Sequence, residues 1–264
     1  MSGSPQLACI EFASYAQSVA EALDAVGAGE VLARQEAVLI KPNLVNPSPP
    51  PVTTPVECCE AVIEYVRRHS SARIVIAEGC GAANGETPDC FEALGYEELS
   101  RRAGVPLLDL NHAPTVRRHL PGLAVFPEFH LPQAALEHFI VSVPVLKAHS
   151  LAEITGTMKN MMGFAPPRHY QQGGHWKKSA FHARMHESIR DLNRHRAADL
   201  TVLDARVGLA EFHLGGPECD PPVNRIAAGF DPLAMDRLAA ELLGKDWQDI
   251  PHLANWEPGP SGGF

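Results

Sequence analysis

The chain lacks the motifs by which the commonest cofactor sites are recognised. It contains neither the G-x-G-x-x-G fingerprint of dinucleotide-binding folds nor the G-x-x-x-x-G-K-[ST] phosphate-binding loop. Its six cysteines are scattered, and none forms the C-x-x-C spacing typical of zinc sites and built-in iron–sulfur clusters. We therefore expect no P-loop or Rossmann site, and the identity of any cofactor stays open.

Long apolar runs and excess positive charge are also missing. No apolar run approaches the roughly 18 residues that a membrane span requires, and the start of the chain lacks the charged and apolar regions of a signal peptide. The net charge is −9, which disfavours nucleic acid or an anionic membrane as the main partner. We expect a cytoplasmic protein that binds a small molecule, as a monomer or an oligomer.

Lysine is scarce, and its positions are unusual. Of 22 basic Lys and Arg residues only six are lysine: Lys41, Lys147, Lys159, Lys177, Lys178 and Lys245. Three of them occupy apolar junctions, in "VLIKPN", "VPVLKAH" and "TMKNMMG". A strongly hydrated ammonium is costly to hold in such places unless an anion receives it. These three lysines are candidates for chemistry on an anionic ligand.

The pattern of apolar residues predicts the fold class. Apolar runs of strand length, at 37–45, 73–79, 105–111, 138–149 and 200–206, alternate with helical segments at 54–69, 89–104, 182–195 and 231–244. This alternation predicts an α/β fold with a mostly parallel sheet flanked by helices. We expect a single domain over 1–264, or two closely packed lobes, with a core at 37–256. The N-terminus, the tail 257–264 and a loop at 168–179 are expected to be loose or mobile.

Capping residues mark the helix boundaries. Thr54 is the expected N-cap of the helix at 54–69, and Gly104 the expected C-cap of the helix at 89–104. Asp231, followed by proline, is the expected N-cap of the last helix. Thr155 and Gly163 would begin and end a short helix, "GTMKNMMG".

Charged residues recur at the carboxyl ends of the predicted strands, namely Lys41, Glu78, Asp109, Lys147 and Asp204. In parallel sheets these ends share one edge, where open α/β folds bind ligands. The set would then form one cavity of mixed charge. The alternative is that each residue simply emerges into water at the end of its strand.

The segment that contains Lys147 and His149 leads directly into the short predicted helix. The two side chains are two residues apart, so an extended backbone places them on one face, in front of the helix N-terminus. A carboxylate or phosphate would fit there. In the alternative interpretation the methionines of this helix fill the core and Lys159 extends its amine to solvent.

Histidines offer a second, weaker arrangement. His182 and His186 are four residues apart on a predicted helix, which is a spacing that binds a divalent metal if a third ligand comes from elsewhere, for example His149 or Asp204. The alternative is a solvated helix face, because 13 histidines produce such pairs by chance.

Four segments together resemble the domain of unknown function 362 family: "IKPNLV", "VPVLKAHSLAEITGTMKNMMG", "LTVLDARVGLAEFHLGGP" and "GFDPLAMDRLAAELLG". The likeness covers roughly residues 37 to 256. It implies that the family's motif positions are Lys41, Asn43, Lys147, His149, Lys159, Asn160, Asp204, Asp231 and Asp236. Some members carry ferredoxin-like cysteine motifs and are linked to iron–sulfur chemistry, but this chain departs from them by lacking those motifs.

Three functions remain open. The first is an enzyme that acts on a small anionic metabolite by acid–base chemistry, with Lys147, His149 and Asp204 as catalytic residues. The ligand-binding residues would be Lys41, Asn43, Glu78, Lys159 and Asn160. The second is a redox enzyme that works with a divalent metal or an external iron–sulfur partner. The third is a protein that binds a ligand or cofactor without catalysis.

Overall fold

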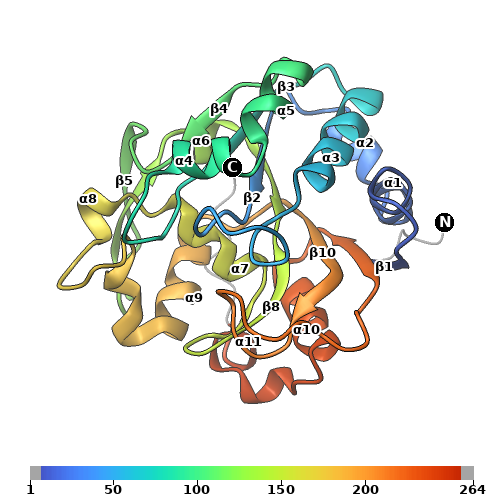
Figure 1. The fold of residues 1–264 in the computed structure, drawn as a ribbon. Coiled ribbons are helices and arrows are strands. Elements are labelled where there is room, and N and C mark those ends of the chain that lie inside the picture. The colour runs from blue at the N-terminus through green and yellow to red at the C-terminus, as the bar shows by residue number, and fades with distance from the viewer. Residues whose placement is uncertain (1–6, 257–264) are drawn as a thin grey trace.

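A nine-stranded mixed sheet runs through the middle of the molecule (Figure 1). The computed structural model describes residues 7–256, so the predicted loose tail lies outside the described residues. The strands follow the order β1-β11-β10-β7-β2-β3-β4, and β8 extends from β10 and pairs with β9. Their bounds are β1 Leu7–Glu11, β2 Ala37–Pro42, β3 Arg73–Glu78, β4 Leu107–Asp109, β7 Phe139–Val143, β8 Val145–His149, β9 Glu153–Thr155, β10 Leu200–Leu209 and β11 Arg225–Gly229.

The strands that the sequence predicted form the parallel part of this sheet. β10, β7, β2, β3 and β4 pair in parallel, and β8 pairs in parallel with β10. The mostly parallel α/β fold is therefore confirmed. The predicted core omitted the first strand, however, because the short run "LACIE" gives little periodic signal. β1 closes one edge by antiparallel pairing with β11.

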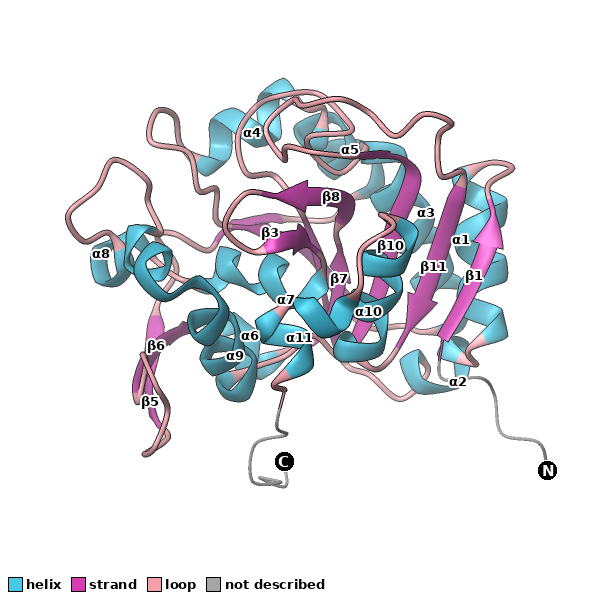
Figure 2. Ribbon diagram, turned by 90° about the horizontal axis from the view of Figure 1, so that it is seen from below, coloured by secondary structure: helices cyan, strands magenta, loops and turns pink. Residues whose placement is uncertain are grey.

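Both faces of the sheet are buried, which explains why its strands are apolar without alternation. In β2, Leu39 belongs to one core cluster, while Val38 and Ile40 belong to the cluster on the other face. Helices cover each face (Figure 2). One layer contains α1 Tyr15–Ala25, α2 Ala28–Leu32, α3 Val56–His69 and α5 Tyr96–Ala103, and the other contains α7 Thr157–Asn160, α9 Met185–His195, α10 Pro232–Leu242 and α11 Pro251–Ala254.

The remaining elements are short. They are α4 Thr87–Ala93, α6 Ala134–Glu137, α8 Pro167–Tyr170, the hairpin strands β5 Thr115–His119 and β6 Glu128–Pro132, and the 3-10 helices η1 Met161–Phe164, η2 Ser179–Arg184 and η3 Trp247–Asp249. The hairpin projects from the body of the molecule (Figure 2). Within residues 7–256 no helix is long and apolar enough to cross a membrane.

The capping predictions have mixed outcomes. Gly104 ends α5 in the left-handed conformation, and Asp231 caps α10 by accepting from two backbone amides, so both predictions are confirmed. Thr54 is not an N-cap, since its hydroxyl donates to the carbonyl of Val143 at 2.7 Å. The helix predicted at 89–104 is two helices, because Gly95 adopts a φ of 81° between them.

Candidate functional site

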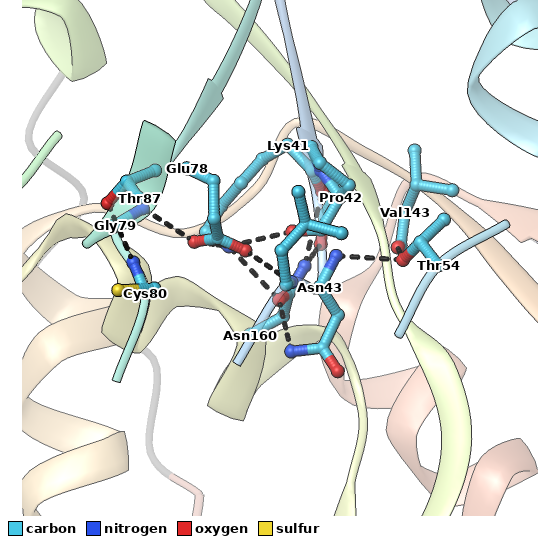
Figure 3. A network of polar contacts seen from close by, with 12 residues as sticks. Lys41, Pro42, Asn43, Thr54, Glu78, Gly79, Cys80, Thr87, Val143 and Asn160 are labelled. Atoms are coloured by element: carbon cyan, nitrogen blue, oxygen red, sulfur yellow. Dashed lines mark hydrogen bonds and ion pairs between the residues drawn. The ribbon is translucent and has the colours of Figure 1, made fainter. Parts of the chain in front are cut away.

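The carboxyl ends of β2 and β3 meet the short helix α7 in a buried polar network (Figure 3). Lys41 Nζ donates to Glu78 Oε1 at 2.7 Å and to Asn160 Oδ1 at 3.1 Å. The same Asn160 oxygen accepts from Asn43 Nδ2 at 3.2 Å. The Asn160 Nδ2 group donates to Ser142 Oγ and to the Lys41 carbonyl. Every polar atom of the Asn160 amide is therefore satisfied, which fixes its orientation.

Glu78 is held by three donors, and among the described residues it forms an ion pair only with Lys41. Besides Lys41, it accepts from the backbone amides of Leu44 at 2.8 Å and Gly79 at 2.7 Å. Gly163 must lack a side chain here, because a Cβ would lie 2.3 Å from Glu78 Oε1 and 2.4 Å from Lys41 Cε. The glycine of the "KNMMG" segment thus lets helix η1 pack directly on the ion pair.

Lys147 adjoins this network and lines neither of the cavities described below. Its side chain is buried, and its amine donates to Asn43 Oδ1 at 2.5 Å and to the Val52 carbonyl at 2.6 Å. Burial, followed by the charge of Lys159, lowers the pKa of Lys147 to about 7. Lys147 therefore orients Asn43, and through it Asn160.

Lys159 differs from the other lysines because its amine has no partner in the described part of the chain. No described residue forms a hydrogen bond or ion pair with it, and it lines both of the cavities described below. Burial and the charge of Lys41 lower the pKa of Lys159 to about 8. An ammonium in this position can form a hydrogen bond or ion pair with a ligand in either cavity.

The helix that carries Lys159 is capped from a distant part of the chain. Asp236 of α10 accepts from the backbone amides of Thr157 at 2.5 Å and Met158 at 3.0 Å. The predicted N-cap Thr155 belongs instead to β9, and its buried hydroxyl has no partner among the described residues. Gly156 gives the Asp236 carboxylate its space, because a Cβ there would lie 2.2 Å from Oδ1.

Lys178 is a site residue that the sequence analysis missed. It lies in the segment predicted to be a mobile loop, yet it is buried and donates to Asn111 Oδ1 and to the Ala165 carbonyl. Its neighbour Lys177 is also buried and donates to the Gly85 carbonyl at 2.7 Å, so this loop is anchored at two points. Burial lowers the pKa of Lys178 to about 7. The scarcity of lysine was the signal that could have identified it.

Two adjoining cavities open onto these side chains. The inner cavity, about 70 Å³, is lined by Lys41, Asn43, Glu78, Thr155, Lys159, Asn160 and Lys178, together with backbone and apolar groups. The outer cavity, about 250 Å³, is lined by Lys159, Lys178, His149, His182, His213 and mainly apolar side chains. Five residues line both, namely Val45, Gly81, Lys159, Met162 and Lys178. Glu78 is the only carboxylate among the lining residues, so the walls carry more cations than anions.

Stacked imidazoles form part of the outer wall. The rings of His149 and His213 lie 3.8 Å apart. His149 Nδ1 accepts from the backbone amides of Leu151 at 3.0 Å and Ala152 at 3.2 Å, which leaves the ring proton on Nε2 in the neutral form. Burial, followed by the charge of Lys159, lowers the pKa of His149 and lowers that of His213 to about 3. Both rings are neutral near pH 7.

Two of the predicted acidic residues lie away from these cavities. Asp204 accepts from Tyr15 of α1 at 3.0 Å and from the Arg206 amide at 2.9 Å, and it lines neither cavity. The reason is strand parity: Thr201 of the same strand bonds Thr157 on the α7 face, so Asp204, three residues on, points to the other face. Asp109 instead pairs with exposed His112 at 2.7 Å.

The predicted histidine pair does not share one helix. His182 lies in η2 and lines the outer cavity, whereas His186 lies in α9 with its Nδ1 2.9 Å from His252 Nδ1. Over residues 7–256 no group of three or more His, Cys, Asp or Glu side chains is arranged to hold a metal ion. An iron–sulfur cluster requires four such ligands in one place, so this part of the chain does not fit a built-in cluster.

Fold and site together define an α/β protein with a lysine-lined cavity at the carboxyl edge of its parallel strands. The chain belongs to the family described as domain of unknown function DUF362, whose model matches residues 38–241. No curated protein matches the chain.

Among solved structures, the chain is similar to the lactate racemase apoprotein from Thermoanaerobacterium thermosaccharolyticum. The TM-score is 0.58 and the identity 14%, and the match covers 91% of this chain and 56% of that one. At this identity the likeness shows the fold alone. The chain spans little more than half the length of that racemase.

Proposed function

We propose that this protein is an enzyme that binds a small organic acid in the inner cavity and moves a proton to or from it. The observation that carries the proposal is the Lys159 side chain, which lines both cavities and whose amine has no partner within residues 7–256. The unpartnered hydroxyl of Thr155 lines the same inner cavity. Buried polar groups of folded proteins are normally satisfied, so the buried Thr155 hydroxyl indicates a ligand. The amine of the partly exposed Lys159 adds a positive charge that an anionic ligand would balance.

The side chains around Lys159 have different roles in binding and proton transfer. Lys41 forms an ion pair with Glu78, whereas no carboxylate within residues 7–256 forms an ion pair with Lys159 or Lys178, so these two supply positive charge for the acid. With a pKa of about 8, Lys159 exchanges a proton readily near neutral pH. The neutral His149 ring presents Nε2–H as a donor to charge that develops on the substrate.

This assignment changes the roles predicted from the sequence. Lys159 becomes the proton-transfer residue, and Lys147 becomes a positioning residue that acts through Asn43. The fold it shares with a lactate racemase supports a small organic acid as the substrate class. We propose small anionic molecules, rather than nucleic acid or membranes, as the partners of a cytoplasmic enzyme.

The proposal is tested by hydrogen exchange into substrate. A panel of small organic acids, including lactate, is incubated with the protein in D₂O, and deuterium incorporation is followed by NMR. We expect exchange with at least one acid, and its loss in Lys159→Met. Lys245→Met is the matched control, because that lysine pairs with Glu153 and lines neither cavity. Binding without exchange would favour a non-catalytic binding protein, and equal exchange by Lys159→Met would contradict the proposed role.

A further inference from the structure

We propose that the bound acid carries an apolar body, which fills the outer cavity while its acidic group occupies the inner one. This inference rests on the proposed function and specifies its substrate class. The two cavities differ in both size and chemistry. The inner one holds about 70 Å³ and is lined mainly by polar side chains, three lysines and the Glu78 carboxylate among them, whereas the outer one holds about 250 Å³ and is lined mainly by apolar side chains and imidazoles. An acid with only a methyl group beyond its carboxylate would leave most of the outer cavity to water.

The mouth of the outer cavity is lined by exposed apolar side chains. Leu151, Trp176 and Phe212 are 48%, 39% and 42% exposed, and all three line this cavity. Among the described residues only two other large apolar side chains are comparably exposed, Val116 and Leu136. Exposed apolar side chains gathered at one place mark binding sites, whereas scattered ones need no explanation.

The three mouth residues come from separate segments. Leu151 follows β8, Trp176 belongs to the loop anchored by its two lysines, and Phe212 follows β10. Their convergence on one cavity therefore cannot be explained by the packing of a single helix or strand.

The deeper wall of the outer cavity continues the apolar surface. Met162 and Met185 line it and are almost fully buried. Methionine side chains adapt to ligands of different shape, which suits the recognition of an apolar body. His213 Nδ1, which has no partner among the described residues, is a polar position for one further group on the ligand.

The orientation of the ligand follows from where the unbalanced cations lie. Lys159 and Lys178 stand at the junction of the two cavities, and Lys41 and Thr155 line only the inner one. The acidic group would lose the neighbouring Lys41 amine if it moved into the outer cavity, whereas the apolar body finds its aromatic contacts, Trp176 and Phe212, only in the outer cavity.

The test measures dissociation constants by calorimetry for acetate, hexanoate, 3-phenylpropanoate and the neutral 3-phenylpropanamide. We expect the two longer acids to bind about 10-fold to 100-fold more tightly than acetate, because each buried methylene adds favourable transfer free energy. Leu151→Ala and Trp176→Ala should weaken binding of the longer acids several-fold and leave acetate unchanged. Leu136→Ala is the matched control, since this exposed leucine lies beside Phe139 at the opposite end of the strands.

The outcomes separate this inference from the proposed function. Equal affinity for all three acids, or mouth variants that leave the longer acids unaffected, would overturn the apolar-body inference while acid binding stands. If the neutral amide bound as tightly as its acid, and Lys159→Met left both unchanged, the acid-binding function would fail and the apolar site would remain. Absence of binding by all four compounds would contradict both.

Discussion

Removing the charge of Glu78 should destabilise the protein strongly, because Lys41 depends on it. In Glu78→Gln the new amide has one oxygen for three donors, the Lys41 amine and the amides of Leu44 and Gly79. Whichever way it is oriented, its NH₂ group faces at least one N–H group. Breaking a buried ion pair by removing one partner costs about 3–5 kcal/mol of unfolding free energy. Domains of this kind have only about 5–15 kcal/mol in total.

Urea denaturation measures this loss, and an exposed ion pair provides the control. Glu60 pairs with Arg102 on the surface, where the two side chains are 33% and 52% exposed, so Glu60→Gln should cost at most about 1 kcal/mol. We expect Glu78→Gln to recover part of its stability as the pH rises from 7 to 9, because Lys41 without its partner releases its proton more easily. Equal losses in the two variants at pH 7 would refute the account of the buried pair.

Three further predictions concern the same buried cations. Gly163→Ala should lower the unfolding free energy, measured by calorimetry, by about 1–3 kcal/mol or more, because its Cβ would displace the Lys41–Glu78 ion pair. Gly81→Ala is the control and should fold normally, since its Cβ would meet only Val45, at 3.8 Å. Lys147→Arg should lose about 1–3 kcal/mol in urea denaturation and most activity, because the larger guanidinium must fit where the amine of Lys147 is buried between Asn43 and the Val52 carbonyl; near-normal stability would contradict this. The unfolding free energy of the wild type should rise between pH 7 and about 8.5, because the unfolded chain binds more protons there than the folded one. The rise is up to about 1.4 kcal/mol per pH unit for each of Lys147, Lys159 and Lys178, whose pKa values are lowered. A urea midpoint that stays flat or falls over this range would count against it.

The sequence allowed the parallel core and much of the site to be predicted for one physical reason. Parallel strands end at one edge, so residues at those ends, such as Lys41 and Glu78, meet in space although 37 positions separate them. The short helix bearing Lys159 was also foreseeable, but its cap was not. Asp236 lies 79 positions from the Thr157 amide that it accepts from, and local capping rules favoured the adjacent Thr155.

What could not be predicted depends on side-chain direction and on loops. Asp204 was predicted at a strand end, but β10 continues to Leu209 and the Asp204 side chain points to the α1 face, which becomes evident only from the contacts of the strand. Lys178 and His213 come from segments without regular periodicity, so their meeting with Lys159 depends on tertiary folding. The exposed apolar mouth is similarly invisible in sequence, because Leu151, Trp176 and Phe212 are far apart along the chain.

Titration of Lys159 by NMR tests most directly whether its amine receives the anionic ligand. Because the chain has only six lysines, labelling lysine with ¹³C at Cε gives few signals, and the signal missing in Lys159→Met identifies this residue. We expect a pKa of about 8 for Lys159 in the free protein, and a rise when a small carboxylate is added, because an anion stabilises the ammonium. A Lys159 pKa near the ordinary 10.5, unmoved by every carboxylate tried, would contradict it.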